Sequence, residues 1–148
     1  MYFVDRNKIE RTLLYAEALL QQFQQHTYES FFEKMALERM VQSLIESMID
    51  VGNMMIDGFI MRDPGSYEDI IDILVDEKVL PKEESDQYKK VFGLRKMLVR
   101  DYLNVDHDEL QQTITDSLTS LNAFSQRVRV YLDQELGPVS AFSNSSND

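Results

Sequence analysis

The residues best suited to chemistry lie in one short basic segment, residues 89–100, of a chain that is acidic as a whole. The 148-residue sequence has a formal net charge of −11, yet this segment holds five of its fifteen Lys and Arg residues and no Asp or Glu. Cationic side chains gathered in this way suit the binding of a phosphate or a similar anion. Because the average field repels phosphate, we expect no DNA binding, and any contact with RNA must be local.

Arg95 is the most unusual member of the basic segment. At about 100° per residue it lies near the centre of an apolar arc, whose other members are Tyr88, Val91, Phe92, Leu98, Val99, Tyr102 and Leu103. A buried charge without a partner is too costly to keep. Arg95 therefore either pairs with an acid, such as Asp50 across a helical bundle or one at a dimer seam, or contacts a phosphate or substrate.

A second line of residues follows the flank of that arc at spacings of four, three and four: Lys89, Gly93, Lys96 and Arg100. Gly93 costs a helix about 1 kcal/mol relative to alanine. Its missing side chain would let another backbone or a phosphate approach closely. The alternative is a solvated charged face with a glycine at a tight helix contact.

Several other chemistries are disfavoured by the residues present. The absence of Cys excludes disulfides, zinc–thiolate sites and a cysteine nucleophile. Neither His26 nor His107 has the Glu three residues earlier that a di-iron bundle needs. Arg100 does precede His107 by six residues, but we interpret this as a coincidence of spacing. We expect no cofactor and no metal, although one acidic ladder could in principle collect a hard cation: Glu46, Asp50, Asn53 and Asp57.

Helical periodicity accounts for nearly all of the chain. It predicts a first helix capped by Asp5, helices over about 32–57 and 67–78, a fourth from Pro81 to about 103, and a fifth from about 107 to 136. Capping boxes are expected at Ser66 with Asp69 and at Asp106 with Glu109. Four long helices and one short helix predict an all-α, up-and-down four-helix bundle with one additional short helix. Residues 1–137 would form a single domain, followed by a flexible polar tail over 138–148.

The buried faces of the two first helices follow from the same periodicity. The first helix should bury Ile9, Leu13, Ala16, Leu20 and Phe23. The second is long enough to need two partner helices or a dimer mate to cover it. The N-terminus lacks the apolar core of a signal peptide, and no window of about 18 uncharged apolar residues occurs. We therefore expect a cytoplasmic protein with no membrane partner.

A resemblance to a known family appears over residues 64–106. The segment PGSYEDIIDILVDEKVL, followed by FGLRKMLVRDYLNVD, resembles the HepT-like branch of the HEPN families. Members carry a Pro–Ser/Tyr turn, a short helix, and then a helix with Arg-Asn, a Leu-Val-His-x-Tyr segment and a closing Val-Asp. The resemblance implies a dimer in which the Arg-x4-6-His segments of both protomers face one cleft that cleaves RNA. It also implies a toxin whose antitoxin is a small nucleotidyltransferase that adenylylates the tyrosine.

The match can be followed residue by residue. Arg95 stands at the motif arginine and Tyr102 at the modified tyrosine, whereas Lys96 replaces asparagine and Arg100 replaces the histidine. Arginine stays protonated and cannot serve as a base. Because general acid–base assistance is worth about 10² to 10⁴ in rate, we expect weak or lost nuclease activity.

Two functions follow as hypotheses. The first is a HepT-like homodimer that binds RNA or a nucleotide in a basic cleft through Arg95, Lys89, Lys96 and Arg100. The second is a non-catalytic homodimerisation or protein-interaction module in which Arg95 pairs with an acidic residue. A working nuclease would need another base, for which Tyr102 is the nearest candidate.

Overall fold

The computed structural model describes residues 4–137, and all of their regular structure is helical. In chain order the elements are α1 (Arg6–Gln24), α2 (Phe31–Gly58), α3 (Tyr67–Asp76), the 3₁₀ turn η1 (Lys82–Glu84), α4 (Ser85–Gly93), α5 (Arg95–Val99), the 3₁₀ turn η2 (Tyr102–Asn104), α6 (His107–Asp116) and α7 (Leu118–Leu136). The predicted all-α fold is confirmed. The predicted tail, residues 138–148, lies outside the described residues.

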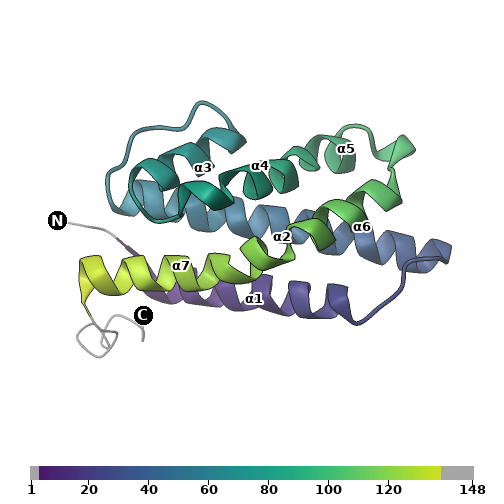
Figure 1. Cartoon of the computed structure of the whole chain (residues 1–148), viewed down its shortest axis with the longest axis horizontal. Coiled ribbons are helices and arrows are strands. Elements are labelled where there is room, and N and C mark those ends of the chain that lie inside the picture. Colours follow the sequence, from purple (N-terminus) through teal and green to yellow (C-terminus); the bar gives the residue numbers. More distant parts are fainter. Residues whose placement is uncertain (1–3, 138–148) are drawn as a thin grey trace.

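The long helical segments alternate in direction along the molecule (Figure 1), with α3 as the additional short helix. These segments are α1, α2, α4 with α5, and α6 with α7. α1 and α2 lie antiparallel and make the most extensive helix contact. α6 packs against α2 and α4, whereas α7 runs beside α1. α3 packs against α2 and α4, and α4 is followed by α5, which also contacts α2 (Figure 1). None of the helices within residues 4–137 has the length and apolarity needed to cross a membrane.

The helix ends follow the local signals in the sequence. Asp5 accepts a hydrogen bond from the Lys8 amide at 3.0 Å, and Asp106 accepts one from the Glu109 amide at 3.0 Å. Ser66 accepts from the Asp69 amide as predicted. α7 ends at Gly137, whose φ of 84° is the left-handed conformation that favours glycine.

The core is one continuous cluster that draws on every α-helix. The buried residues of α1 are the five predicted from its period. α2 buries apolar residues along one face, beside a partly buried Met40: Leu37, Val41, Leu44, Ile45, Met48, Val51 and Met55. Gly52 lies where α2 meets α3, and a Cβ built on it would come within 2.5 Å of Ile70 Cγ2. The absence of a side chain at residue 52 therefore sets how closely α3 approaches α2.

Two helices that the sequence predicts as continuous are interrupted. The predicted fourth helix ends at Gly93, turns at Leu94 and ends again near residue 99 instead of running to residue 103. The Leu94 amide bonds to the Val91 carbonyl at 3.1 Å, the tighter spacing of a 3₁₀ turn. Gly93 weakens the helix at this point, and the tighter turn buries Leu94, which is 4% exposed.

The predicted fifth helix is interrupted at Ser117, which separates α6 from α7. The Ser117 amide is shared between the carbonyls of Thr113 and Ile114, both at 3.1 Å. The change of direction lets α6 pack on α2 and α7 pack on α1. A single straight helix could not follow both neighbours, so tertiary packing decides the break.

Candidate functional site

The interruption at Leu94 decides where Arg95 lies. Beyond the break, Leu94 and Leu98 are the buried side chains, so the buried face has turned away from the arc defined by Tyr88 and Phe92. Arg95 is consequently at the edge of the core rather than at its centre. Its side chain is 28% exposed, which leaves it accessible from solvent.

Arg95 is held by one carboxylate and one aromatic ring. Its Nε donates to Glu46 Oε1 at 2.7 Å, and the guanidinium carbon lies 4.5 Å from the centre of the Tyr67 ring. This hydrogen bond to the Glu46 carboxylate raises the pKa of Arg95 above its ordinary value. The predicted pairing with an acid across the bundle is confirmed, but the acid is Glu46, one helical turn before Asp50. The terminal nitrogens of Arg95 make no hydrogen bond within residues 4–137.

The Tyr67 ring is positioned by the turn that precedes α3. Asp69 accepts two hydrogen bonds from Arg62, at 2.8 and 2.9 Å, and one from the Gly65 amide at 2.8 Å. The Arg62 hydrogen bonds lower the pKa of Asp69 to about 2. Asp69 therefore does not complete the predicted capping box, because its carboxylate fixes the turn instead. This turn delivers Tyr67, the first residue of α3, to the Arg95 guanidinium.

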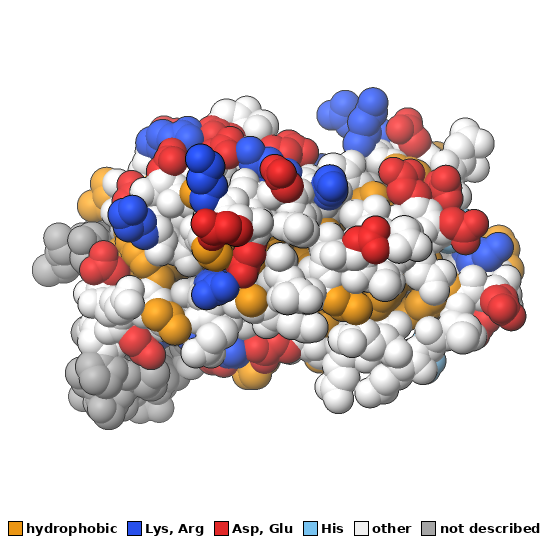
Figure 2. Space-filling view, in the orientation of Figure 1, with side chains coloured by type: hydrophobic (Ala, Val, Ile, Leu, Met, Phe, Trp, Pro, Cys, Tyr) orange, Lys and Arg blue, Asp and Glu red, His pale blue; other side chains and the backbone are white. Residues whose placement is uncertain are grey.

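The remaining basic residues divide into paired and unpaired ones. Lys89 contacts Asp72 of α3 at 2.6 Å, which raises its pKa. Lys96 and Arg100 are exposed and have no carboxylate partner in the described part of the chain. They lie one turn apart, since the Arg100 amide bonds to the Lys96 carbonyl at 2.8 Å. Figure 2 shows Lys and Arg side chains gathered above α5, whereas the surface over α3 and α4 mixes both charges.

The apolar residues after α5 do not enter the core. Val99, Tyr102 and Leu103, which the arc would place beside Arg95, are 39%, 64% and 82% exposed. The early end of α5 is the reason, because the chain leaves the helical period at Arg100. Gly93 faces open space, and a Cβ there would meet nothing within 4 Å. Within residues 4–137 no tight helix contact explains this glycine.

The two histidines lie in different surroundings. His107 Nε2 lies 2.7 Å from Glu38 Oε2, which joins the first residue of α6 to α2. His26 is exposed and contacts Gln22 at 3.2 Å. Among residues 4–137 no group of three or more His, Asp or Glu side chains is arranged to hold a metal ion. The acidic ladder of α2 instead supplies Glu46 to Arg95.

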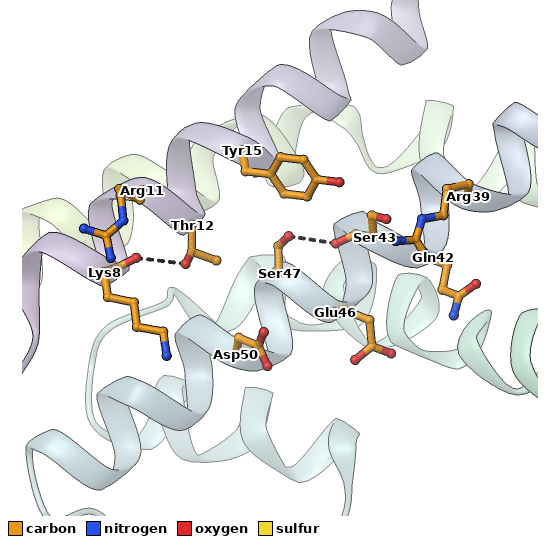
Figure 3. Close-up of a pocket in the computed structure, with 10 residues that line it drawn as sticks. All are labelled: Lys8, Arg11, Thr12, Tyr15, Arg39, Gln42, Ser43, Glu46, Ser47 and Asp50. Atoms are coloured by element: carbon orange, nitrogen blue, oxygen red, sulfur yellow. Dashed lines mark hydrogen bonds between the residues drawn. The ribbon is translucent and has the colours of Figure 1, made fainter.

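A groove between α1 and α2 was not predicted from the sequence. It has a volume of about 470 Å³ and contains Lys8, Arg11 and Tyr15 from α1 with Arg39 and Asp50 from α2 (Figure 3). Glu46 borders it, so the groove adjoins the Arg95 pair. The available signal was the polar spacing of α1 at residues 8, 11, 12 and 15, on the side away from its buried residues.

Comparison with known proteins agrees with these features. The ribonuclease HepT-like family matches residues 9–128. YutE of Bacillus subtilis (strain 168), which is named as an RNase candidate, is 54% identical over 143 residues, covering 96% of this chain and 99% of YutE. The solved structure of YutE, described as a cytosolic protein of unknown function, has a TM-score of 0.92 and covers 95% of this chain and 99% of that one.

A more distant structure shares the fold. A tri-AMPylated Shewanella oneidensis HEPN toxin, solved in complex with MNT antitoxin, is 20% identical to this chain and has a TM-score of 0.73. The match covers 82% of this chain and 96% of the toxin. The resemblance predicted from residues 64–106 is thus confirmed over most of the sequence. From its helices, its Arg95 segment and these relatives, the chain belongs to the ribonuclease HepT-like family.

Proposed function

We propose that this protein is a HepT-like homodimer with a basic cleft at α5 that binds RNA or a nucleotide, and that its nuclease activity is weak or lost. One observation carries the proposal. Lys96 and Arg100 are exposed without carboxylate partners among residues 4–137, and they lie on α5 and its C-cap together with Arg95, whose terminal nitrogens make no hydrogen bond within the same residues. Guanidinium groups hold phosphate through paired N–H donors, so this edge of α5 suits a phosphodiester. Lys89 would contact the RNA or nucleotide only after its ion pair with Asp72 breaks.

The weak activity follows from proton chemistry. RNA cleavage by attack of the ribose 2′-hydroxyl needs one group to remove that proton and another to protonate the leaving 5′-oxygen. Arg100 stands where the family has histidine, and arginine does not exchange a proton near neutral pH. Arg95 and Arg100 can still stabilise negative charge on the phosphate. The cleft would therefore bind RNA much better than it cleaves it.

A nucleotidyltransferase antitoxin is the proposed protein partner. Tyr102 stands at the position that family members present for adenylylation, and its side chain is 64% exposed. In that reaction the Tyr102 hydroxyl would attack the α-phosphate of ATP, lose its proton and release pyrophosphate. A structural relative was itself solved as a tri-AMPylated toxin with MNT antitoxin, which supports the proposal. The added phosphate would place negative charge beside Lys96 and Arg100 and weaken RNA binding.

The test compares the natural protein with Arg95→Ala and Arg100→His in chelator-treated buffer. RNA binding is measured by fluorescence anisotropy of a labelled single strand, and cleavage is measured by gel. We expect salt-sensitive binding that Arg95→Ala weakens at least about tenfold. We also expect cleavage to appear or increase in Arg100→His.

Two results would reject this function. Unchanged RNA affinity in Arg95→Ala would reject the proposal that a basic cleft at α5 binds RNA. Efficient cleavage by the natural protein that disappears in Arg95→Ala would keep the cleft but reject lost activity. Thermal melting monitored by circular dichroism confirms that each variant is folded.

A second candidate function is a non-catalytic homodimerisation or interaction module. The Arg95–Glu46 pair favours it, because an internally paired arginine needs no ligand. Exposed apolar residues also occur at the end where α2 begins and η2 lies (Figure 1): Phe31 and Phe32 are 81% and 82% exposed, and Leu103 is similarly exposed. Under this function Arg95→Ala and Leu103→Glu would lower dimerisation in sedimentation experiments and leave RNA affinity unchanged.

A further inference from the structure

The groove between α1 and α2 is the second place where unpaired cations gather. Residues 4–137 contain eight arginines, of which five pair with a carboxylate. The three that do not are Arg11, Arg39 and Arg100, and the first two lie in this groove. Lys8, which also borders the groove, has no carboxylate partner in the described chain either. Within residues 4–137, three cations that line the groove, Lys8, Arg11 and Arg39, therefore have no ion-pair partner.

The charge of the groove opposes that of the whole chain. Lys8, Arg11 and Arg39 contribute three positive charges, and Glu46 and Asp50 contribute two negative ones. The Glu46 carboxylate is already offset by Arg95 on its other side. The groove is thus locally positive although the formal net charge of the chain is −11. Such a site attracts an anion at short range.

The cations lie at the two ends of the groove rather than around one point. In Figure 3 Lys8 and Arg11 occupy one end and Arg39 the other, with Tyr15 between them. The part of α2 that forms the groove, from Arg39 to Asp50, spans about 16 Å at 1.5 Å per residue. A single phosphate would reach only one end. An extended polyanion would contact both.

The middle of the groove offers groups that suit a nucleoside. Tyr15 is 51% exposed, and its ring makes no aromatic or cation–π contact among residues 4–137. Ser43 and Ser47 lie on the floor, where Ser47 donates to the Ser43 carbonyl at 2.7 Å. Asp50 has no partner among residues 4–137 and can accept a hydrogen bond from a ribose hydroxyl.

We propose that this groove binds a short stretch of single-stranded RNA. Its phosphates would contact Arg39 at one end and Arg11 with Lys8 at the other, and a base would stack on Tyr15. Basic grooves with an aromatic stacking surface are the usual means of holding single strands. The inference rests on the proposed function, because Glu46 borders the groove and also pairs with Arg95, so that the two proposed RNA sites are neighbours.

The test measures binding of a labelled single-stranded RNA of mixed sequence at several salt concentrations. The key variant is the double substitution Arg11→Gln/Arg39→Gln. The matched control is Lys78→Gln/Lys82→Gln, which also removes two charges from exposed residues, one just after α3 and one in η1, neither of which lines the groove. We expect the groove variant to bind at least about tenfold more weakly and its salt dependence to fall by about 1.4, the contribution of two phosphates in a single strand.

Two further variants separate charge from stacking. Arg11→Lys/Arg39→Lys keeps the charges and should retain most of the affinity, which shows that any loss in the glutamine variant is electrostatic. Tyr15→Leu should weaken binding about tenfold and leave the salt dependence unchanged, because stacking releases no counterions. Thermal melting verifies that all of these proteins are folded.

The outcomes distinguish this inference from the proposed function. If Arg95→Ala loses RNA binding and Arg11→Gln/Arg39→Gln behaves like the lysine control, the groove is rejected and the α5 cleft stands. The reverse result supports the groove and rejects the α5 cleft. If neither variant changes binding, both proposals fail. A groove variant that alters only the oligomeric state, measured by light scattering, assigns the groove to a second copy of the chain and overturns the RNA proposal.

Discussion

Arg129 and Arg95 are both half-buried arginines that face carboxylates on a neighbouring helix, and they are held in different ways. Arg129 of α7 donates to both oxygens of Glu10, at 2.9 and 2.8 Å, and to Glu17 at 2.7 Å. All three of its nitrogens have partners, and these hydrogen bonds raise its pKa. Arg95 uses only Nε, on a single carboxylate oxygen.

The difference separates an arginine that joins helices from one that can also meet a ligand. A guanidinium has five N–H donors, and a structural role is complete when carboxylates accept them. Arg129 has four of its five donors accepted by Glu10 and Glu17, and it connects α7 to α1. Arg95 keeps its terminal nitrogens for another acceptor while Glu46 and Tyr67 hold its orientation. The number of satisfied donors is therefore a better guide to function than the presence of an ion pair.

The largest effect should come from removing Arg129. Arg129→Met leaves Glu10 and Glu17 as unpaired like charges beside a half-buried side chain, so we expect a loss of about 2 kcal/mol in the free energy of unfolding. Arg95→Met should cost no more than about 1 kcal/mol, because Arg95 makes a single hydrogen bond to one carboxylate at a similar exposure. Urea unfolding followed by circular dichroism measures both. Equal losses of stability would contradict the distinction drawn between Arg129 and Arg95. As a control, adding Glu10→Gln/Glu17→Gln to Arg129→Met should restore part of the stability.

A second prediction concerns Glu46. Glu46→Gln keeps an oxygen that can accept from Arg95 Nε but removes the negative charge beside it. We expect RNA affinity to increase and the salt dependence to steepen by about 0.7 to 0.9, because one more cation is available to phosphate. Anisotropy titrations measure this change, and Glu38→Gln provides a control on the same helix. An unchanged salt dependence would mean that Arg95 serves structure alone.

The sequence predicted those parts of the fold that repeat with the helical period. The buried face of α1 was correct to the residue, because each side chain there is decided by spacing alone. The breaks at Leu94 and Ser117 were missed, because neither contains proline and the apolar period continues through both. The break at Ser117 lets α6 and α7 pack on different helices, and the break at Leu94 buries Leu94; both depend on tertiary packing that the apolar period does not show.

The candidate site was predictable to a similar degree. The basic segment and the motif positions at Arg95 and Arg100 were visible in the linear sequence. The choice of Glu46 over Asp50 was not, because it depends on the angle at which α5 leaves the Leu94 turn. The α1–α2 groove was missed because Arg11 and Arg39 are far apart in sequence and become neighbours only when the helices pair.

A smaller gain is expected from Gly93→Ala. The added Cβ meets nothing within 4 Å in this chain, and alanine is the better helix former, so the free energy of unfolding should rise by about 0.5 to 1 kcal/mol. RNA affinity and dimerisation are measured on the same protein. If either falls while stability rises, the glycine serves an approaching molecule beside Arg95. A less stable variant would show that the open space at residue 93 is filled in solution.

The smallest effect concerns pH and the Arg62–Asp69 pair, in which both oxygens of Asp69 accept a hydrogen bond from Arg62. The pKa of Asp69 is lowered to about 2 from 3.8, first by Arg62 and also by the Gly65 amide. Since the folded pKa lies below the unfolded one, Asp69 stabilises the fold above about pH 4, and this contribution disappears as the pH falls toward 2. The stability difference between the natural protein and Asp69→Asn should therefore shrink over that range in acid melting curves. If the stability difference between the natural protein and Asp69→Asn did not change with pH, the Arg62–Asp69 ion pair would be rejected as its cause.

The close approach of α3 to α2 at Gly52, a core residue, affects how Arg95 is held at the surface. A side chain at residue 52 would clash with Ile70 of α3. We expect the clash to displace α3 and to move Tyr67, which α3 also carries, away from the Arg95 guanidinium. In a selection for variants that no longer bind their ligand, residue 52 would therefore be recovered together with the surface arginines, although no ligand touches it. Gly52 thus affects ligand binding indirectly, because it lets α3 hold the Tyr67 ring against Arg95.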